Sequence, residues 1–155
     1  MTADDAIPPL TDAERSARSS SFGSVAEHYE RYRPGPPADV AAWFVPEPVD
    51  RVVDLGAGTG ALTRLLVPRA RDVVAVEPDD RMRAVLAAEV PGARALAGRG
   101  EAIPVPDDSA QGVFASSSWH WMDPVPTLAE IARVLTPGGV RSARCGPDPT
   151  PTARS

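Results

Sequence analysis

The sequence contains no lysine and no asparagine, and it has one cysteine, Cys145. Without lysine the chain cannot form a Schiff base with a carbonyl substrate, and it lacks the phosphate-binding lysine of P-loop nucleotide hydrolases. Without asparagine it has no acceptor for N-linked glycans. A single cysteine excludes an internal disulfide and any metal site built from several thiolates.

Long apolar runs and an excess of positive charge are missing as well. No stretch of 18 apolar residues could cross a bilayer, and the acidic start MTADDAIPPL lacks the apolar segment of a secretory signal. With 21 acidic and 16 basic residues, all arginine, the net charge of −5 does not favour nucleic acid or an anionic membrane. We therefore expect a cytoplasmic protein that binds neither. The composition, rich in Ala, Gly, Pro and Arg, is typical of a GC-rich bacterial gene.

Strands and helices are predicted to alternate through the middle of the chain. The apolar, β-branched runs predict strands at 51–55, 72–77, 93–97 and 112–117. Apolar residues at helical spacing predict helices at 24–33, 38–45, 61–70, 79–90 and 124–139. This alternation predicts parallel βαβ units with right-handed crossovers. The expected fold class is α/β, with a Rossmann-like parallel sheet in the order 3-2-1-4 and flanking helices.

The two ends of the chain differ from this pattern. Residues 1–21 are polar and without periodicity, so we expect a disordered tail, with the domain itself at 22–140. Residues 141–155 hold three prolines and no Val, Ile, Leu or aromatic residue, which predicts a second disordered tail. The sheet would then end at the strand 112–117. Such an exposed edge is expected to favour self-association.

A glycine-rich turn, GAGTG at 56–60, lies between the first predicted strand and its helix. Gly56, Gly58 and Gly60 let the backbone approach a ligand closely, and the helix that follows offers unpaired N–H groups. Glu77 ends the second predicted strand, which neighbours the first in a doubly wound sheet. Its carboxylate is therefore expected to face the same crevice, where it can accept hydrogen bonds from ribose hydroxyls.

Two nucleoside cofactors are compatible with this turn. GAGTGA, with Ala61 in the last place, satisfies the dinucleotide pattern G-x-G-x-x-G/A, so an NAD-binding oxidoreductase is one alternative. Asp54 stands two residues before the first glycine, and a carboxylate there repels a pyrophosphate but suits a cation. S-adenosyl-L-methionine carries a sulfonium and an ammonium and no phosphate. The sequence therefore favours S-adenosyl-L-methionine.

Several segments resemble a known family. VVDLGAGTGALTRLL and VVAVEPDDRM are similar to the first two motifs of class I S-adenosylmethionine-dependent methyltransferases, and RVLTPGG is similar to their turn before strand five. SFGSVAEHYERYRPGPP and SSSWHWMDP resemble small-molecule methyltransferases near the trans-aconitate methyltransferase type. That family has a seven-stranded sheet in the order 3-2-1-4-5-7-6. The resemblance therefore implies that this chain is truncated after strand four.

The resemblance also implies roles for individual residues. The three glycines and Asp54 would line the methionine end of the cofactor, and Glu77 would hold its ribose. Met82 would pack on the adenine, and Tyr29 and Arg33 would close over the carboxylate of the cofactor. An arginine fork binds a carboxylate bidentately. Residues 98–104 resemble the loop that covers adenine. Arg99 or Gly100 stands there in the place of an aspartate found in many relatives.

Methyl transfer mainly requires that nucleophile, methyl carbon and sulfur be aligned. A carboxylate acceptor needs no base, whereas a hydroxyl or amine acceptor would use His120, which follows the fourth strand between Trp119 and Trp121. The tryptophans could form the wall of a substrate pocket. Two histidines without clustered acids predict no metal site. The predicted function is methyl transfer to a small-molecule acceptor; a non-catalytic, cofactor-binding fragment is the other alternative.

Overall fold

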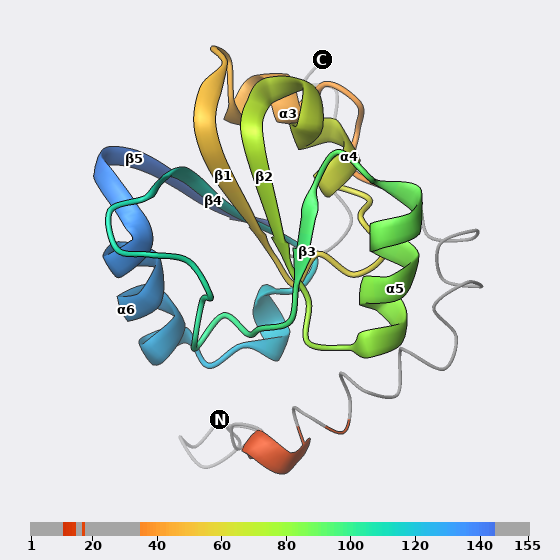
Figure 1. The fold of residues 1–155 in the computed structure, drawn as a ribbon. Coiled ribbons are helices and arrows are strands. Elements are labelled where there is room, and N and C mark those ends of the chain that lie inside the picture. The colour runs from red at the N-terminus through yellow and green to blue at the C-terminus, as the bar shows by residue number, and fades with distance from the viewer. Residues whose placement is uncertain (1–10, 15–16, 18–34, 145–155) are drawn as a thin grey trace, which may run out of the picture.

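Five parallel strands form one sheet in the order β3-β2-β1-β4-β5 (Figure 1). The computed structural model describes residues 11–14, 17 and 35–144. The strands are β1 (Val49–Leu55), β2 (Ala70–Val76), β3 (Arg94–Leu96), β4 (Ala110–Ser116) and β5 (Leu135–Arg144). The predicted α/β class and the order 3-2-1-4 of the first four strands are confirmed.

The fifth strand corrects one expectation. β5 pairs in parallel with β4 from Gly112↔Val140 to Ser116↔Arg144, so the sheet does not end at β4 and residues 141–144 are not a disordered tail. Sheet hydrogen bonds use the main chain, which arginine, serine and alanine supply as well as valine does. β4 lies between β1 and β5, which removes the exposed β4 edge on which the expected self-association depended. Residues 145–155 and the predicted helix 24–33 lie outside the described residues.

The helices lie on both faces of the sheet. They are α3 (Val40–Phe44), α4 (Thr63–Leu66), α5 (Asp80–Glu89) and α6 (Pro124–Val134), with 3₁₀ turns at Val67–Arg69 and Trp119–Trp121. The predicted helix 61–70 is shortened because Pro68 has no N–H to continue the α-helical hydrogen bonds. Asp79 and Asp123 cap the N-termini of α5 and α6, their side chains accepting from backbone N–H groups.

The core has two parts because neighbouring residues of a strand point to opposite faces of a sheet. Val53 of β1 packs with Ile131 and Val134 of α6 on one face. Val52 of β1 packs with Val40 of α3 and Leu66 of α4 on the other. In Figure 1, α6 lies on one side of the sheet, and α3, α4 and α5 lie on the other.

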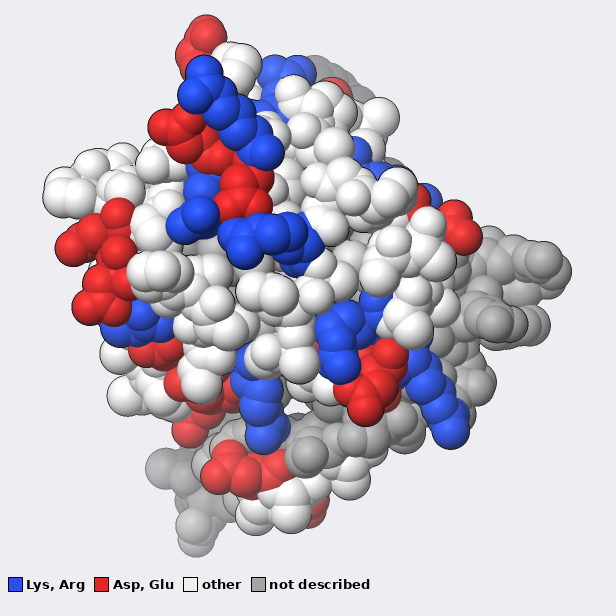
Figure 2. Space-filling model, in the orientation of Figure 1, with Lys and Arg blue, Asp and Glu red and all other residues white. Residues whose placement is uncertain are grey.

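Hydrogen bonds between charged side chains link the neighbouring strands β1, β2 and β3. Asp72 of β2 accepts from Arg51 of β1 at 2.6 Å and from Arg94 of β3 at 2.7 and 2.8 Å. The hydrogen bond from Arg94 is the largest cause that lowers the pKa of Asp72. In Figure 2, acidic and basic side chains lie next to one another on this face. None of the helices in the described part of the chain has the length and hydrophobicity that crossing a membrane requires.

Candidate functional site

The glycine-rich turn leaves the carboxyl end of β1 in a backbone conformation that favours glycine. Gly56, Gly58 and Gly60 have φ of 62°, 58° and 97°. The N–H groups of Gly56 and Ala57 donate to the carbonyl oxygen of Val76 at 2.9 and 3.1 Å, which fixes the turn against the end of β2. The sequence prediction that glycine is required here is therefore supported by the dihedral angles.

The three glycines differ in the space around them: two are packed against side chains of the protein, and one is open. A Cβ atom at Gly56 would lie 2.5 Å from Ser118 Cβ, and one at Gly60 would lie 2.9 Å from Val90 Cγ2. The protein itself therefore fills the space that a side chain would take at these two positions. A Cβ at Gly58 would meet only Met82 Sδ, at 3.9 Å. Gly58 is thus the glycine with room for a ligand against its backbone.

Glu77 follows β2 directly and is 95% buried, with 5% of its surface exposed. Its Oε2 accepts from the N–H of Gly58 at 2.8 Å, and its Oε1 accepts from the N–H of Asp79 at 2.9 Å. Burial raises the pKa of Glu77, and the two backbone hydrogen bonds oppose that rise. Each oxygen keeps a second lone pair, so the fixed carboxylate can accept two hydrogen bonds from a diol.

Asp54 lies in β1, one residue before the strand ends, and only 1% of it is exposed. Its Oδ2 accepts from Thr63 Oγ1 of α4 at 2.7 Å. Burial raises the pKa of Asp54 to about 7, the Thr63 hydrogen bond opposes this, and the charge of Glu77 adds to it. A nearby cation would favour the ionised form. Asp54 is therefore a carboxylate whose charge depends on what lies next to it.

Met82 of α5 is buried, and its N–H donates to Asp79 Oδ1 at 3.0 Å. The structure thus brings Met82, Gly58 and Glu77 together, as the resemblance implies. Tyr29 and Arg33 lie outside the described residues.

Ser118 closes the junction between β1 and β4. It is buried, and its Oγ donates to the carbonyl oxygen of Leu55 at 2.7 Å. The crossover direction reverses between these two neighbouring strands, and ligands of open α/β sheets bind at such a switch point. Sequence reasoning missed Ser118; the available signal was the expected adjacency of strands one and four together with a small residue next to a glycine.

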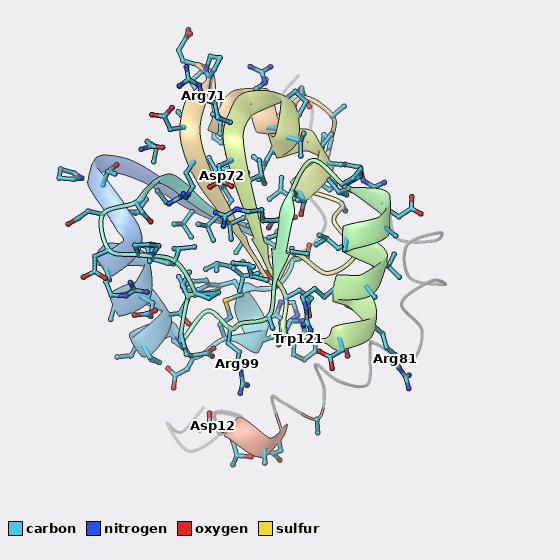
Figure 3. All side chains as sticks on the ribbon, viewed as in Figure 1. Asp12, Arg71, Asp72, Arg81, Arg99 and Trp121 are labelled. Carbon is cyan, nitrogen blue, oxygen red and sulfur yellow. The ribbon has the colours of Figure 1, made fainter. Side chains whose placement is uncertain are left out.

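His120 lies in the 3₁₀ turn Trp119–Trp121 that follows this junction. Its side chain is exposed, and its ring lies 4.5 Å from that of Trp121, tilted by 49°. Trp119 packs against the core, whereas Trp121 is half-buried. In Figure 3, Trp121 lies at the end of the sheet where α5 begins, opposite the end that carries Arg71. His120 and the tryptophans therefore lie at the same end of the sheet as the glycine-rich turn.

The loop after β3 has no room for a side chain at position 100. A Cβ at Gly100 would lie 2.6 Å from Met122 Sδ and 2.9 Å from Thr127 Cγ2. Arg99 is exposed and lies 4.0 Å from a carboxylate oxygen of Glu101. Neither Arg99 nor Gly100 supplies the aspartate side chain that the resemblance would place in this loop. Among the residues that the structure describes, no group of three or more His, Cys, Asp or Glu could hold a metal ion.

A doubly wound sheet, a glycine turn after its first strand and a buried acid after its second define a Rossmann-like domain built for a nucleoside cofactor. Gly58 has open space where a side chain would lie, and two buried carboxylates, Asp54 and Glu77, stand at the ends of β1 and β2, which suits a positively charged ligand.

Comparison with known proteins identifies the family. Residues 53–142 match the methyltransferase domain family. An uncharacterized methyltransferase of Mycobacterium tuberculosis is 49% identical over 125 residues, which cover 81% of this chain and 51% of the relative. The malonyl-[acyl-carrier protein] O-methyltransferase of Methylococcus capsulatus is 35% identical over 146 residues, which cover 86% of this chain and 53% of that relative. The solved TehB-like SAM-dependent methyltransferase of Corynebacterium glutamicum superposes with a TM-score of 0.64 at 16% identity, covering 83% and 72%, and shows the same fold.

The chain belongs to the methyltransferase domain family. The predicted class, an S-adenosylmethionine-dependent methyltransferase domain, is confirmed, and S-adenosyl-L-methionine is the cofactor of that class. The chain spans about half the length of the curated relatives it matches.

Proposed function

We propose that the chain binds S-adenosyl-L-methionine at the carboxyl ends of β1 and β2 and that its methyl group is transferred to a small-molecule acceptor. The observation that carries this proposal is that two buried carboxylates, Asp54 at the end of β1 and Glu77 directly after β2, are close enough to interact, and that Glu77 accepts from the N–H of the open glycine Gly58. Buried carboxylates repel a pyrophosphate and favour a positively charged ligand. This arrangement supports S-adenosyl-L-methionine over NAD.

Each group has a distinct task in this proposal. Glu77 accepts from the two ribose hydroxyls, and Gly58 allows the methionine part to lie against the backbone. Asp54 stabilises the positive charge at the methionine end, and Met82 packs on the adenine. Tyr29 and Arg33 are proposed to bind the cofactor carboxylate. The cofactor supplies an activated methyl group, so the protein mainly holds the donor and the acceptor in line.

The acceptor is proposed to bind beside the turn Trp119–Trp121. The half-buried Trp121 offers a flat apolar surface there, and the exposed His120 beside it would take a proton from a hydroxyl or amine. A carboxylate acceptor would not use His120, and the Methylococcus capsulatus relative is named a malonyl-[acyl-carrier protein] O-methyltransferase. His120→Gln is therefore expected to slow transfer to hydroxyl or amine acceptors only. We place this reaction in the cytoplasm, with no nucleic acid, membrane or metal ion involved.

Ligand choice tests the cofactor assignment. In calorimetric titrations at equal protein concentration, S-adenosyl-L-methionine and its demethylated product, S-adenosylhomocysteine, are expected to bind, and NADH to bind much more weakly or not at all. Tighter binding of NADH than of either sulfur ligand would contradict the proposal.

Asp54→Asn is expected to separate the methyl donor from the product. The substitution keeps the shape of the side chain and removes its charge, so affinity for the cationic donor should fall more than affinity for the product, whose sulfur is neutral. Calorimetry with both ligands at pH 8, where Asp54 is ionised, measures the difference. Equal losses would show that the carboxylate does not sense the sulfonium.

Asp54 is also expected to make the unliganded fold less stable as the pH rises. Burial raises its pKa in the folded chain to about 7, above the ordinary value of an aspartate, so the folded state binds a proton that the unfolded state releases near pH 4. The contribution of this proton to the free energy of unfolding is complete below pH 4. It is lost between about pH 4 and 7, and it amounts to on the order of 1–4 kcal/mol. Glu77 acts with the same sign, because its pKa is raised too.

Urea unfolding at pH 5 and pH 8 checks this. Asp54→Asn should reduce the difference between the two free energies of unfolding. Asp50→Asn, which changes an exposed carboxylate of the same strand, is the matched control and should leave the difference in place. A parent chain more stable at pH 8 than at pH 5 would contradict the sign.

A further inference from the structure

Arg83 of α5 extends back to the end of β2 and holds the residue that carries the ribose-binding carboxylate. Its Nη1 donates to the main-chain carbonyl oxygen of Glu77 at 2.9 Å. Its Nη2 contacts Asp80 Oδ1 in the first turn of α5, and the side chain is only 21% exposed. The guanidinium therefore links the start of α5 to the segment that positions Glu77.

Charged groups near Glu77 affect how readily its carboxylate ionises. Asp79, between β2 and α5, lies on one side and raises the pKa of Glu77, and Asp54 of β1 is close enough to interact with it. Burial is the largest cause that raises the pKa of Glu77, and the backbone hydrogen bonds from Asp79 and Gly58 are the largest that lower it. Arg83 is the cation that opposes the two acids within the described part of the chain. Removing its charge would leave the buried carboxylate with two interacting acids and no opposing cation.

We propose that Arg83 is a positioning residue for cofactor binding, which fixes the main chain at Glu77 and whose positive charge stabilises the buried carboxylate that accepts from the ribose hydroxyls. This inference rests on the proposed function of Glu77. A protonated carboxyl group keeps fewer acceptor sites and offers a hydrogen of its own, so it pairs less well with a diol whose hydroxyls donate. Arg83 thus affects cofactor affinity without contacting the cofactor.

Arg81 provides a matched control on the same helix. Figure 3 shows Arg81 pointing away from the sheet, and its side chain is exposed. Arg83→Gln and Arg81→Gln remove the same charge from positions two residues apart, so they change the net charge of the protein equally. Arg83→Lys keeps the charge and loses the fork of the guanidinium.

The experiment titrates S-adenosylhomocysteine by calorimetry from pH 5.5 to 8.5, with thermal unfolding of each variant recorded in parallel. Arg83→Gln is expected to move the acidic loss of affinity to higher pH, so that its Kd exceeds that of the parent most at the acidic end of the range. At pH 8.5 the difference should shrink. Arg83→Lys should recover most of the affinity, and Arg81→Gln should follow the parent curve.

A double variant tests whether Arg83 affects cofactor affinity through the charge of Glu77. In a Glu77→Gln background, where residue 77 cannot ionise, Arg83→Gln is expected to cause no further pH-dependent loss. The carboxyl carbon signal of Glu77 in ¹³C NMR should titrate at higher pH in Arg83→Gln than in the parent, with or without ligand. An unshifted Glu77 titration, or an equal loss of affinity at every pH and in both backgrounds, would overturn the role of Arg83.

The same measurements separate this inference from the proposed function. A parent chain that does not bind S-adenosylhomocysteine, or a Glu77→Gln variant that binds it as tightly as the parent, would contradict the ribose assignment itself. The titration of Glu77 in the unliganded protein would still show whether the charge of Arg83 stabilises that carboxylate.

Discussion

Glu77→Ala is expected to weaken the binding of both S-adenosyl-L-methionine and S-adenosylhomocysteine by about 1–3 kcal/mol, the range for hydrogen bonds to a charged group. Both ligands carry the same ribose, so the two losses should be equal. The side chain also accepts from the N–H groups of Gly58 and Asp79. Its removal leaves both donors without that partner, and the glycine turn loses its attachment to the end of β2.

Two further variants distinguish these contributions. Glu77→Gln keeps one oxygen acceptor and the shape of the side chain, so it should lose less affinity than Glu77→Ala. Glu89→Ala removes an exposed carboxylate at the other end of α5 and should leave both affinities as in the parent. Calorimetry on all three proteins measures the losses. An unchanged affinity in Glu77→Ala would show that the carboxylate does not hold the ribose.

Most of the site could be predicted from the sequence because it lies on the alternating core of the fold. The strand–glycine turn–helix pattern placed Gly56, Gly58 and Gly60 correctly at the end of β1, and strand adjacency placed Glu77 beside them. These inferences need only the order of elements and the fact that carboxyl ends of parallel strands share one edge.

The residues that were missed depend on side-chain reach, which periodicity does not contain. Ser118 binds a carbonyl oxygen 63 residues earlier in the chain, and Arg83 reaches six residues back. Neither contact leaves a pattern in the local sequence.

Strand β5 was missed for a related reason. The pairing of residues 140–144 is made by the main chain, and the expectation of a disordered tail was based on side-chain types alone. The prolines that suggested disorder, at 147, 149 and 151, come only after β5 ends at Arg144. The predicted helix 124–139 extends past the end of α6 at Val134 because Leu135 continues its apolar face, although Leu135 already belongs to β5.

Gly56→Ala is expected to be among the most destabilising single substitutions in the described part of the chain, by roughly 2–5 kcal/mol. The methyl group would be placed 2.5 Å from Ser118 Cβ and 2.7 Å from Ser118 Oγ, closer than carbon and oxygen atoms can approach. Overpacking of this kind costs about 1–3 kcal/mol, and the left-handed conformation of Gly56, with φ at 62°, adds about 1–2 kcal/mol for any L-residue.

Gly138→Ala is the matched control for the backbone part of this cost. Gly138 also has positive φ, at 82°, but a Cβ there would meet no atom within 4 Å. Its replacement should therefore cost about 1–2 kcal/mol in the free energy of unfolding, through conformation alone. Urea unfolding of the two variants against the parent gives the difference that belongs to the contact with Ser118.

A second substitution tests whether that contact is the cause. Ser118→Gly removes the Cβ and Oγ atoms that the new methyl group would meet, at the cost of the hydrogen bond to Leu55. In the double variant Gly56→Ala/Ser118→Gly, the loss of stability should be smaller than the sum of the two single losses, because the clash is absent. This result would show that Gly56 is required because the side chain of Ser118 packs directly against it at the junction of β1 and β4. Strictly additive losses, or equal losses for Gly56→Ala and Gly138→Ala, would show instead that the backbone conformation alone requires glycine at this turn.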